Sequence, residues 1–393
     1  MPIRHLITPH PRAERSADDT RERAGSNLET APSSESSAEG LNLTRLPSEL
    51  LVGSTRRSGV MERWVIVLVG VLAMVGLSAC KDDATEAGPA RSSEPIEVST
   101  SGIDGRIVFQ RYDPSIDGPV TYTVDPDGSD MRPLFEDGHS ESARWSPDGT
   151  EIQISCCGDG MTAHLIDPRT GELRILPAAD PKLELFCGNA WSPDGERLAC
   201  EGYGKQDQAL TGAYSIRASD GGDLTRITSN TRGWDGPGDY SPDGTQMVFV
   251  RVDEEETTFR LFVTDLDGTG LHKISGDLVD ELSPGRWSPT GDQILFAGRV
   301  DPDHHKTIWV VNADGSSLHK LQIDPACGGL WSDPDAVGCY SPAWSPDGTK
   351  IVYVRSTPEG EDEGIYIANA DGSGSVRVTD GEDDQPDWGT SPV

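Results

Sequence analysis

The pentapeptide Trp145-Ser146-Pro147-Asp148-Gly149 decides the fold, because an aromatic residue followed by Ser-Pro-Asp-Gly recurs along most of the chain. Trp287 begins a near copy with Thr in place of Asp, and Trp388 begins a degenerate copy that keeps only Trp-Gly. The aromatic residues of the six copies are 46, 49, 47, 57 and 44 residues apart. A four-stranded propeller blade needs about 40 to 50 residues. The repeat therefore predicts six blades, with aromatic residues at Trp145, Trp191, Tyr240, Trp287, Trp344 and Trp388.

A second motif recurs in step with the first. Asp125-Pro126-Asp127-Gly128 is its first copy, and six copies end in Asp-Gly or a close variant. Each follows an alternating segment such as Ile308-Trp309-Val310-Val311 and precedes a short one such as Arg226-Ile227-Thr228. Asp-Gly between alternating apolar segments is a strong hairpin signal. One unit thus has four antiparallel strands, and the predicted fold class is all-β.

The two ends of the repeat region predict how the ring closes. The chain enters at Arg106-Ile107-Val108-Phe109, which matches the second strand of a blade, and it leaves at Gln385-Pro386-Asp387-Trp388, which matches a first strand. A first strand supplied by the C-terminal segment would leave no free sheet edge at the junction. We therefore expect a six-bladed β-propeller over residues 103–390, closed by the C-terminal strand.

These motifs resemble a known family. The aromatic-Ser-Pro-Asp-Gly unit with a following Asp-Gly hairpin is similar to the repeats of TolB-like propellers, which are related to those of tricorn-type and prolyl-oligopeptidase-type peptidases. The resemblance covers about residues 103–390 and implies the fold more specifically than the function. TolB carries an α/β domain before its propeller, and residues 81–102 are too few for one. The assembly role of TolB is therefore not transferred to this chain.

The N-terminal quarter predicts an exported lipoprotein. Residues 1–60 are polar, and we expect them to be disordered or to precede the true start. Residues 61–80 contain Met61-Glu62-Arg63, a short apolar run and Leu77-Ser78-Ala79-Cys80, which resembles the lipobox of bacterial lipoproteins. Cys80 would carry the lipid, and 81–102 would be a flexible tether. The alternative is an uncut membrane anchor. The expected location is the periplasmic or extracellular side of the cell envelope.

The charge excludes one class of partner. Lys and Arg number 33 against 66 Asp and Glu, which gives a formal net charge of −33. Such a chain does not neutralise phosphates, so nucleic acid is excluded as a partner. Residues 1–80 hold nine Arg and nine acidic residues, so the whole excess lies on the exported part. We expect a monomer that attracts a protein or other envelope macromolecule with a basic segment.

The predicted working face carries the loops between second and third strands and between blades, because these vary in length whereas the turns do not. The insertion at 324–341 is the longest. The acidic segments of this face have two interpretations. They form either a solvated surface or a negatively charged funnel that attracts a basic partner or Ca²⁺. No other cofactor is expected. Trp side chains there either anchor a partner or cap their own blade. The candidate partner-binding residues are Trp234, Asp253, Glu254, Glu255, Glu256, His304, His305 and Trp331.

Six cysteines follow Cys80, and in an exported domain disulfides are the default. A two-residue turn at Pro193-Asp194 places Cys187 opposite Cys200, unless a bulge at Gly195 shifts the register. Cys327 and Cys339 flank the longest insertion and could close it. The vicinal pair Cys156-Cys157 remains, and exchanged pairings with Cys187 and Cys200 stay open.

Sequence motifs for catalysis are missing. The chain has no Gly-x-Ser-x-Gly, no His-Glu-x-x-His, no phosphate-binding loop and no dinucleotide fingerprint. The sequence therefore favours a non-catalytic propeller that binds a partner through its loop face. The alternative is a metal-dependent carbohydrate lyase, or another enzyme that uses the propeller funnel, with His139, His304 and His305 as candidate groups.

Overall fold

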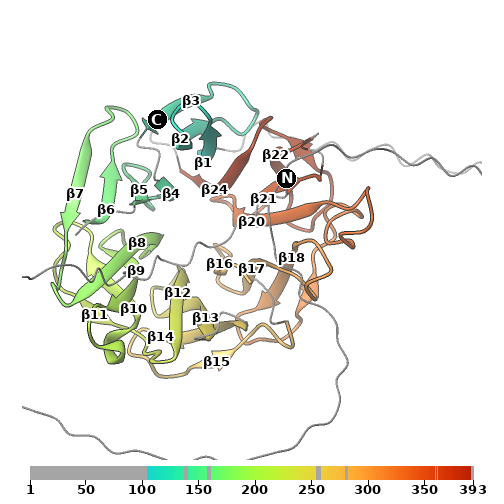
Figure 1. Cartoon of the computed structure of the whole chain (residues 1–393). Coiled ribbons are helices and arrows are strands. Elements are labelled where there is room, and N and C mark those ends of the chain that lie inside the picture. The colour runs from blue at the N-terminus through green and yellow to red at the C-terminus, as the bar shows by residue number, and fades with distance from the viewer. Residues whose placement is uncertain are drawn as a thin grey trace, which may run out of the picture. The chain divides into compact units, whose positions relative to one another are not determined.

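The computed structural model describes residues 104–136, 140–156, 161–253, 258–278, 282–358, 360 and 362–390. Six four-stranded antiparallel sheets stand around a common centre (Figure 1), which confirms the all-β class and the six-bladed propeller. The 3-10 turn η1 (Gln208–Leu210) is the one helical element of the described part. The predictions for 1–60, 61–80 with Cys80, and 81–102 lie outside the described residues.

Each blade begins with its innermost strand. Blade 1 consists of β24 (Asp383–Gly389), β1 (Arg106–Asp113), β2 (Gly118–Val124) and β3 (Arg132–Glu136). Blade 2 consists of β4 (Ser140–Trp145), β5 (Ile152–Cys156), β6 (Met161–Ile166) and β7 (Leu173–Pro177). Blade 3 consists of β8 (Leu183–Trp191), β9 (Arg197–Gly204), β10 (Gly212–Arg217) and β11 (Thr225–Arg226).

The other half of the ring has the same order. Blade 4 consists of β12 (Gly233–Tyr240), β13 (Gln246–Asp253), β14 (Phe259–Asp265) and β15 (His272–Lys273). Blade 5 consists of β16 (Arg286–Trp287), β17 (Gln293–Gly298), β18 (Thr307–Asn312) and β19 (His319–Lys320). Blade 6 consists of β20 (Gly338–Trp344), β21 (Lys350–Ser356), β22 (Gly364–Asn369) and β23 (Val376–Arg377).

The predicted closure of the ring is confirmed. β24 pairs with β1 in an antiparallel register that sets Ile107 opposite Trp388 and Arg111 opposite Asp383. Ile107 and Trp388 are buried in one cluster with side chains of blade 6. The last described strand therefore completes the first blade, and contacts from one end of the repeat region stabilise the other.

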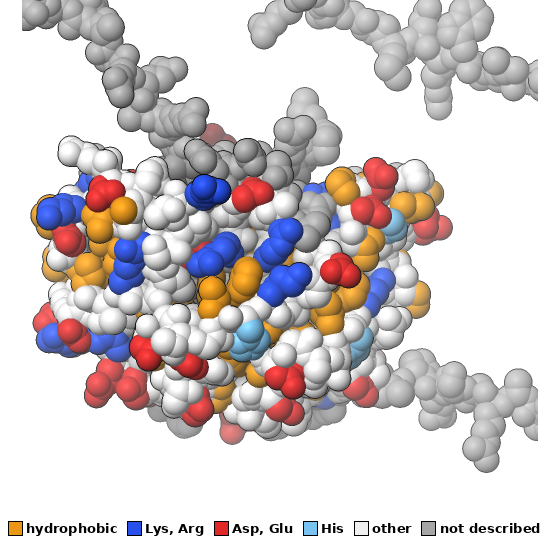
Figure 2. All heavy atoms as spheres, turned by 90° about the horizontal axis from the view of Figure 1, so that it is seen from below, with side chains coloured by type: hydrophobic (Ala, Val, Ile, Leu, Met, Phe, Trp, Pro, Cys, Tyr) orange, Lys and Arg blue, Asp and Glu red, His pale blue; other side chains and the backbone are white. Residues whose placement is uncertain are grey.

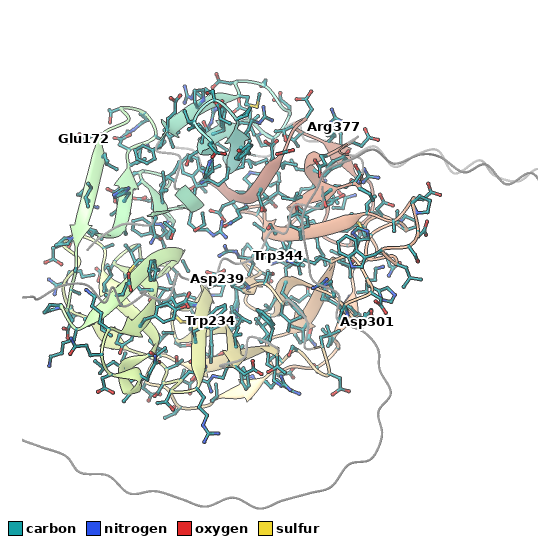
Figure 3. All side chains as sticks on the ribbon, viewed as in Figure 1. Glu172, Trp234, Asp239, Asp301, Trp344 and Arg377 are labelled. Carbon is teal, nitrogen blue, oxygen red and sulfur yellow. A yellow bond between two sulfur atoms is a disulfide. The ribbon has the colours of Figure 1, made fainter. Side chains whose placement is uncertain are left out.

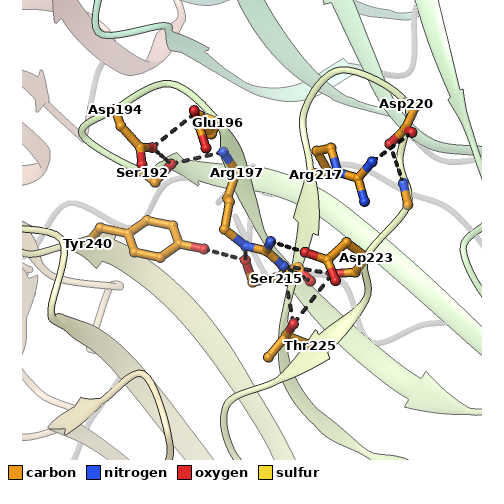
Figure 4. Close-up of polar contacts among 11 residues, drawn as sticks. Ser192, Asp194, Glu196, Arg197, Ser215, Arg217, Asp220, Asp223, Thr225 and Tyr240 are labelled. Atoms are coloured by element: carbon orange, nitrogen blue, oxygen red, sulfur yellow. Dashed lines mark hydrogen bonds and ion pairs between the residues drawn. The ribbon is translucent and has the colours of Figure 1, made fainter.

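The Ser-Pro-Asp-Gly turns are built alike. In blade 3 the Ser192 hydroxyl donates to the Asp194 carboxylate at 2.5 Å and accepts the Arg197 backbone N–H at 2.9 Å (Figure 4). Gly195 has φ 74°, which glycine adopts without steric cost. The three residue types thus have local mechanical roles, because Pro presets φ at the second position and Ser and Asp satisfy the backbone of the turn.

The disulfide prediction for blade 3 is confirmed, although its register argument is wrong in detail. Cys187 pairs with Cys200 in the ladder, and the two form a disulfide. At the turn, however, Trp191 pairs with Leu198 rather than with Glu196, because the turn is longer than two residues. A bulge between Cys187 and Ala190 restores the predicted partners. Two irregularities that compensate each other therefore produce the expected pairing.

The second predicted disulfide, Cys327–Cys339, is also present. The side chain of Cys156 and all of Cys157 lie outside the described residues, so their pairing stays a prediction. The two disulfides indicate a protein of an oxidising compartment, as expected for an exported chain. Within the part of the chain that the structure describes, no helix has the length and apolar character needed to span a membrane.

Candidate functional site

The topology separates two faces. The turn face carries the turns between first and second and between third and fourth strands; the loop face carries the remaining connections. Described acidic residues occur on both faces. Repeated turn aspartates such as Asp127, Asp243 and Asp267 accept hydrogen bonds within their own turns, and the edge-on view in Figure 2 shows basic as well as acidic side chains. Negative charge alone therefore does not locate the site.

On the loop face, blade 5 brings two loops together. Residues 299–306 connect β17 to β18, and the long insertion folds back onto them. His304 forms a bridge with Leu330, the His305 N–H donates to the Gly329 carbonyl at 2.8 Å, and the Trp331 N–H donates to the Asp303 carbonyl at 2.9 Å. We call residues 299–306 and 327–337 the blade-5 tip. The Cys327–Cys339 disulfide closes its second loop at the base.

Trp331 is the most exposed large apolar residue described, with 56% of its surface accessible. Its indole is nevertheless held in place. Nε1 donates to the Pro302 carbonyl at 3.1 Å, and the ring lies against His305 with centroids 3.7 Å apart. Val300 and Leu330 are exposed at 48% and 45%. The tip thus presents an apolar surface whose central side chain is already ordered, which lowers the entropic cost of binding.

The two histidines of the tip have different environments. His304 Nδ1 lies 2.6 Å from a carboxylate oxygen of Asp301. His305 is buried beneath Trp331, and burial, helped by the nearby Arg299 charge, lowers its pKa. Its Nε2 has no hydrogen-bond partner among the described residues. Burial thus disfavours the charged form of His305, and its ring packs against the indole.

The structure brings three of the eight predicted residues together, namely His304, His305 and Trp331. Trp234 lies at the start of β12, half-buried, with its ring edge-on to Phe259 at 6.4 Å. Figure 3 places Trp234 on the inner side of blade 4 and Asp301 of the tip at the outer edge of the ring. The Asp253 carboxylate accepts from the Thr258 hydroxyl at 2.6 Å. Glu254, Glu255, Glu256 and His139 lie outside the described residues.

Sequence reasoning missed a set of equivalent residues on the innermost strands, which we call the channel residues after the propeller axis on which these strands lie. They stand immediately before the repeated aromatic residue on each innermost strand, and around the ring they read Asp, Arg, Ala, Asp, Arg, Ala. In blade order from blade 1 they are Asp387, Arg144, Ala190, Asp239, Arg286 and Ala343. The pattern is visible in the sequence once the repeats are aligned on their aromatic residues, because position and chemistry repeat every three blades.

The channel carboxylates join neighbouring blades. Asp387 accepts the backbone N–H of Trp145 at 2.9 Å, and Asp239 accepts that of Trp287 at 3.1 Å. Burial raises the pKa of Asp239 to about 7; the Asp387 charge adds to this shift, and the Trp287 N–H and Arg144 oppose it. Burial also raises the pKa of Asp387. Each carboxylate thus links two neighbouring blades, and that of Asp239 titrates near neutral pH.

The same three-blade spacing recurs in a buried ion pair. In blade 4 Arg251 binds both carboxylate oxygens of Asp235 at 2.7 Å, and the Thr228 hydroxyl of blade 3 donates to Asp235 at 2.6 Å. In blade 1 the corresponding groups are Arg111, Asp383 and, from blade 6, Thr379. Both guanidinium groups lie over two aromatic rings of their own blade. We call these the Asp235 cluster and the Asp383 cluster.

No cofactor site emerges from the described part of the chain. Its residues include no group of three or more His, Cys, Asp or Glu side chains placed to hold a metal ion. A pocket of about 320 Å³ lies between the turns of blades 2 and 3. Its carboxylates are occupied, since Asp148 and Asp194 accept from their own turns and Glu151 pairs with Arg174. Calcium binding stays a prediction.

Comparison with known proteins supports the fold. No family model and no curated protein sequence matches the chain. Among solved structures, it is similar to TolB from Acinetobacter baumannii, with 18% identity and a TM-score of 0.55 over 72% of this chain and 66% of that one. An inferred TolB from Agrobacterium tumefaciens gives 18% identity and a TM-score of 0.50 over 71% and 90%. The protein therefore has the TolB-like six-bladed propeller fold.

Proposed function

We propose that this protein is a lipid-anchored component of the cell envelope whose propeller binds a partner protein through the blade-5 tip and performs no chemistry of its own. The observation that carries the proposal is the exposed indole of Trp331, which is fixed by Pro302 and His305 and flanked by Val300 and Leu330. Exposed apolar groups that are already ordered are typical of interface anchors.

The disulfide at the base of the tip supports the proposal. The segment between Cys327 and Cys339 is exposed from 330 to 335, contains Pro334, and has no regular strand before β20 begins at Gly338. A cross-link that closes such a loop restricts its unfolded conformations. A loop that is already restricted loses less conformational entropy on binding than a flexible loop does.

Capture of a partner from envelope extract tests the proposal. The full chain, Trp331→Ala and Leu271→Ala are immobilised in parallel, each with calcium and with a chelator. Leu271 is exposed at 45% near the third-to-fourth-strand turn of blade 4 and is the matched control. We expect one protein to be retained by the wild-type chain and by Leu271→Ala and lost with Trp331→Ala. Equal retention by all three, or none by any, would contradict binding at the tip.

The lipid anchor is tested separately. With Cys80 intact, the chain should incorporate labelled fatty acid and be cut before Cys80, whereas Cys80→Ala should do neither. A chain with Cys80 intact that sediments with membranes, stays uncut and takes up no fatty acid would instead support the uncut anchor.

A further inference from the structure

The immediate surroundings of Trp331 are acidic. Asp301, Asp303, Asp333 and Asp335 all lie within the blade-5 tip and are exposed. Backbone hydrogen bonds fix two of them close to the Trp331 backbone: the Trp331 backbone N–H donates to the Asp303 carbonyl, and the Asp333 N–H donates to the Leu330 carbonyl at 3.0 Å. The two cationic side chains of the tip are Arg299 and Lys306. Four carboxylates against two cations leave the tip with an excess of negative charge.

Two of these carboxylates are unused by the fold. Asp301 accepts from the Asp303 N–H and lies against His304, and Asp333 accepts from the Asp335 N–H at 3.0 Å. The carboxylates of Asp303 and Asp335 have no hydrogen bond or ion pair with any described residue. This differs from the turn face, where Asp127, Asp243 and Asp267 each accept from a neighbouring hydroxyl.

The indole beside them has one free face. One face of Trp331 lies against His305, and its N–H is bound to Pro302, while 56% of its surface is accessible. The exposed face of a tryptophan attracts cations through its quadrupole, and guanidinium groups also stack on it. Asp303 and Asp335 belong to the two loops that meet at Trp331, and an unpaired carboxylate matches the fork of a guanidinium.

We infer that the blade-5 tip receives an arginine side chain of the partner protein, stacked on the free face of Trp331 and paired with Asp303 and Asp335. The inference rests on the proposed function for the identity of the partner as a protein. An exposed indole can also stack on a sugar ring. A neutral sugar, however, gains no electrostatic attraction from the excess of carboxylates, and that excess would repel an acidic polysaccharide.

A titration of the isolated interaction tests the inference. The full chain is labelled with ¹⁵N, and the indole signal of Trp331 is identified by its loss in Trp331→Phe. The probes are N-acetyl-arginine amide, the neutral N-acetyl-citrulline amide of nearly equal size, and cellobiose. We expect the arginine derivative to shift the Trp331 signal at concentrations several-fold below those of the citrulline derivative. Equal responses to the two amides, or a response to cellobiose alone, would overturn the inference.

Charge variants show whether the response is local. Asp303→Asn with Asp335→Asn should raise the apparent Kd for the arginine derivative at least threefold, since two exposed ion pairs are lost together. Asp277→Asn with Asp380→Asn removes the same charge elsewhere on the loop face and should leave the Kd unchanged. If both double variants weaken binding equally, the attraction comes from the net charge and the inference fails.

The two proposals fail separately. If the arginine derivative shifts the Trp331 signal but no partner is captured, the proposed function is contradicted, whereas the arginine-binding site is supported. A captured partner that depends on Trp331 but is indifferent to Asp303→Asn with Asp335→Asn would sustain the proposed function and overturn the inference.

Discussion

The turn face and the loop face of this propeller are built on different principles. On the turn face, one Ser-Pro-Asp-Gly design is repeated, and successive turns lie close together: a Cβ added at Gly244 would meet Pro193 of the preceding blade, and one added at Gly291 would meet Pro242. On the loop face, the blades fall into different kinds: blades 1 and 4 share an Arg–Asp pair, and blade 5 carries a disulfide-closed insertion. The regular face supplies the frame, and the irregular face carries the blade-5 tip.

The largest effect is expected at the buried ion pairs. Asp235→Ala leaves the Arg251 guanidinium without its carboxylate partner, and Asp383→Ala does the same to Arg111. The carboxylates are fully buried, whereas the guanidinium side chains are 27% and 21% exposed, so the loss should reach no more than the roughly 3–5 kcal/mol that breaking a fully buried pair costs. Asp267→Ala, which removes a repeated turn carboxylate, should cost much less. Urea unfolding of the three variants measures the difference.

The Asp383 cluster also joins the two ends of the propeller, since β24 and β1 are far apart in sequence. Asp383→Ala should therefore be at least as destabilising as Asp235→Ala. If Asp267→Ala proves as costly as either, the turn face carries as much individual stability as the loop face, and the contrast between them is wrong.

The two disulfides should differ in function more than in stability. They close segments with sequence separations of 13 and 12, so loop entropy predicts a similar contribution of about 3 kcal/mol to the free energy of unfolding. Cys327→Ser with Cys339→Ser should also move the Trp331 indole signal and weaken partner capture. Cys187→Ala with Cys200→Ala should lower the Tm and leave both readouts unchanged.

This pair of variants separates the tip from the frame. Loss of partner capture on opening Cys187–Cys200, with the Trp331 signal unchanged, would show that the partner contacts blade 3 instead.

Much of the frame was predictable from sequence, and the reason is local. Ser, Pro, Asp and Gly each satisfy a requirement inside one turn, so their recurrence reports the blade count without knowledge of distant contacts. The bulge between Cys187 and Ala190 was not predictable, because it depends on how an innermost strand packs against its neighbours. The outer strands are also shorter than expected: β11 ends at Arg226, since the N–H groups of Ile227 and Thr228 both turn toward the Ala213 carbonyl.

The candidate site was predictable only in part. His304, His305 and Trp331 could be placed on the loop face from the repeat, but their contact depends on two loops that follow no repeat. The bridge between His304 and Leu330 fixes it, and no local pattern encodes that pairing. The channel aspartates can be located in the sequence, because each stands one position before the repeated aromatic residue. Their three-blade spacing, however, becomes visible only when the blades are compared around the ring.

Channel and turn aspartates should respond to pH with opposite signs. The pKa of Asp239 is raised to about 7, so the folded state binds the extra proton. Its contribution to stability is fully present below the ordinary Asp pKa of about 4 and is lost as pH rises toward 7. Donation by Ser241 and Thr245 lowers the pKa of Asp243, so its contribution is lost only as pH falls below about 4.

Urea unfolding across pH 3 to 8 measures both slopes. Relative to wild type, Asp239→Asn should flatten the decline in stability between about pH 4 and 7, by no more than about 1.4 kcal/mol per pH unit. Asp243→Asn should leave this window unchanged and alter only the acidic end. A wild-type curve that rises with pH over this window, unaffected by Asp239→Asn, would show that the channel carboxylate is ionised throughout.

The smallest effect concerns two glycines of the turn face. Gly195 and Gly268 both have positive φ, 74° and 81°, but a Cβ at Gly195 would meet no atom within 4 Å, whereas one at Gly268 would lie 2.8 Å from the Ile227 carbonyl oxygen of blade 3. Gly195→Ala should cost about 1 kcal/mol, from the left-handed backbone alone. Gly268→Ala should cost more, because the neighbouring blade must also move. Equal Tm values for the two would mean that blades 3 and 4 adjust freely at this face, and the turn face would then be a row of independent hairpins rather than a continuous frame.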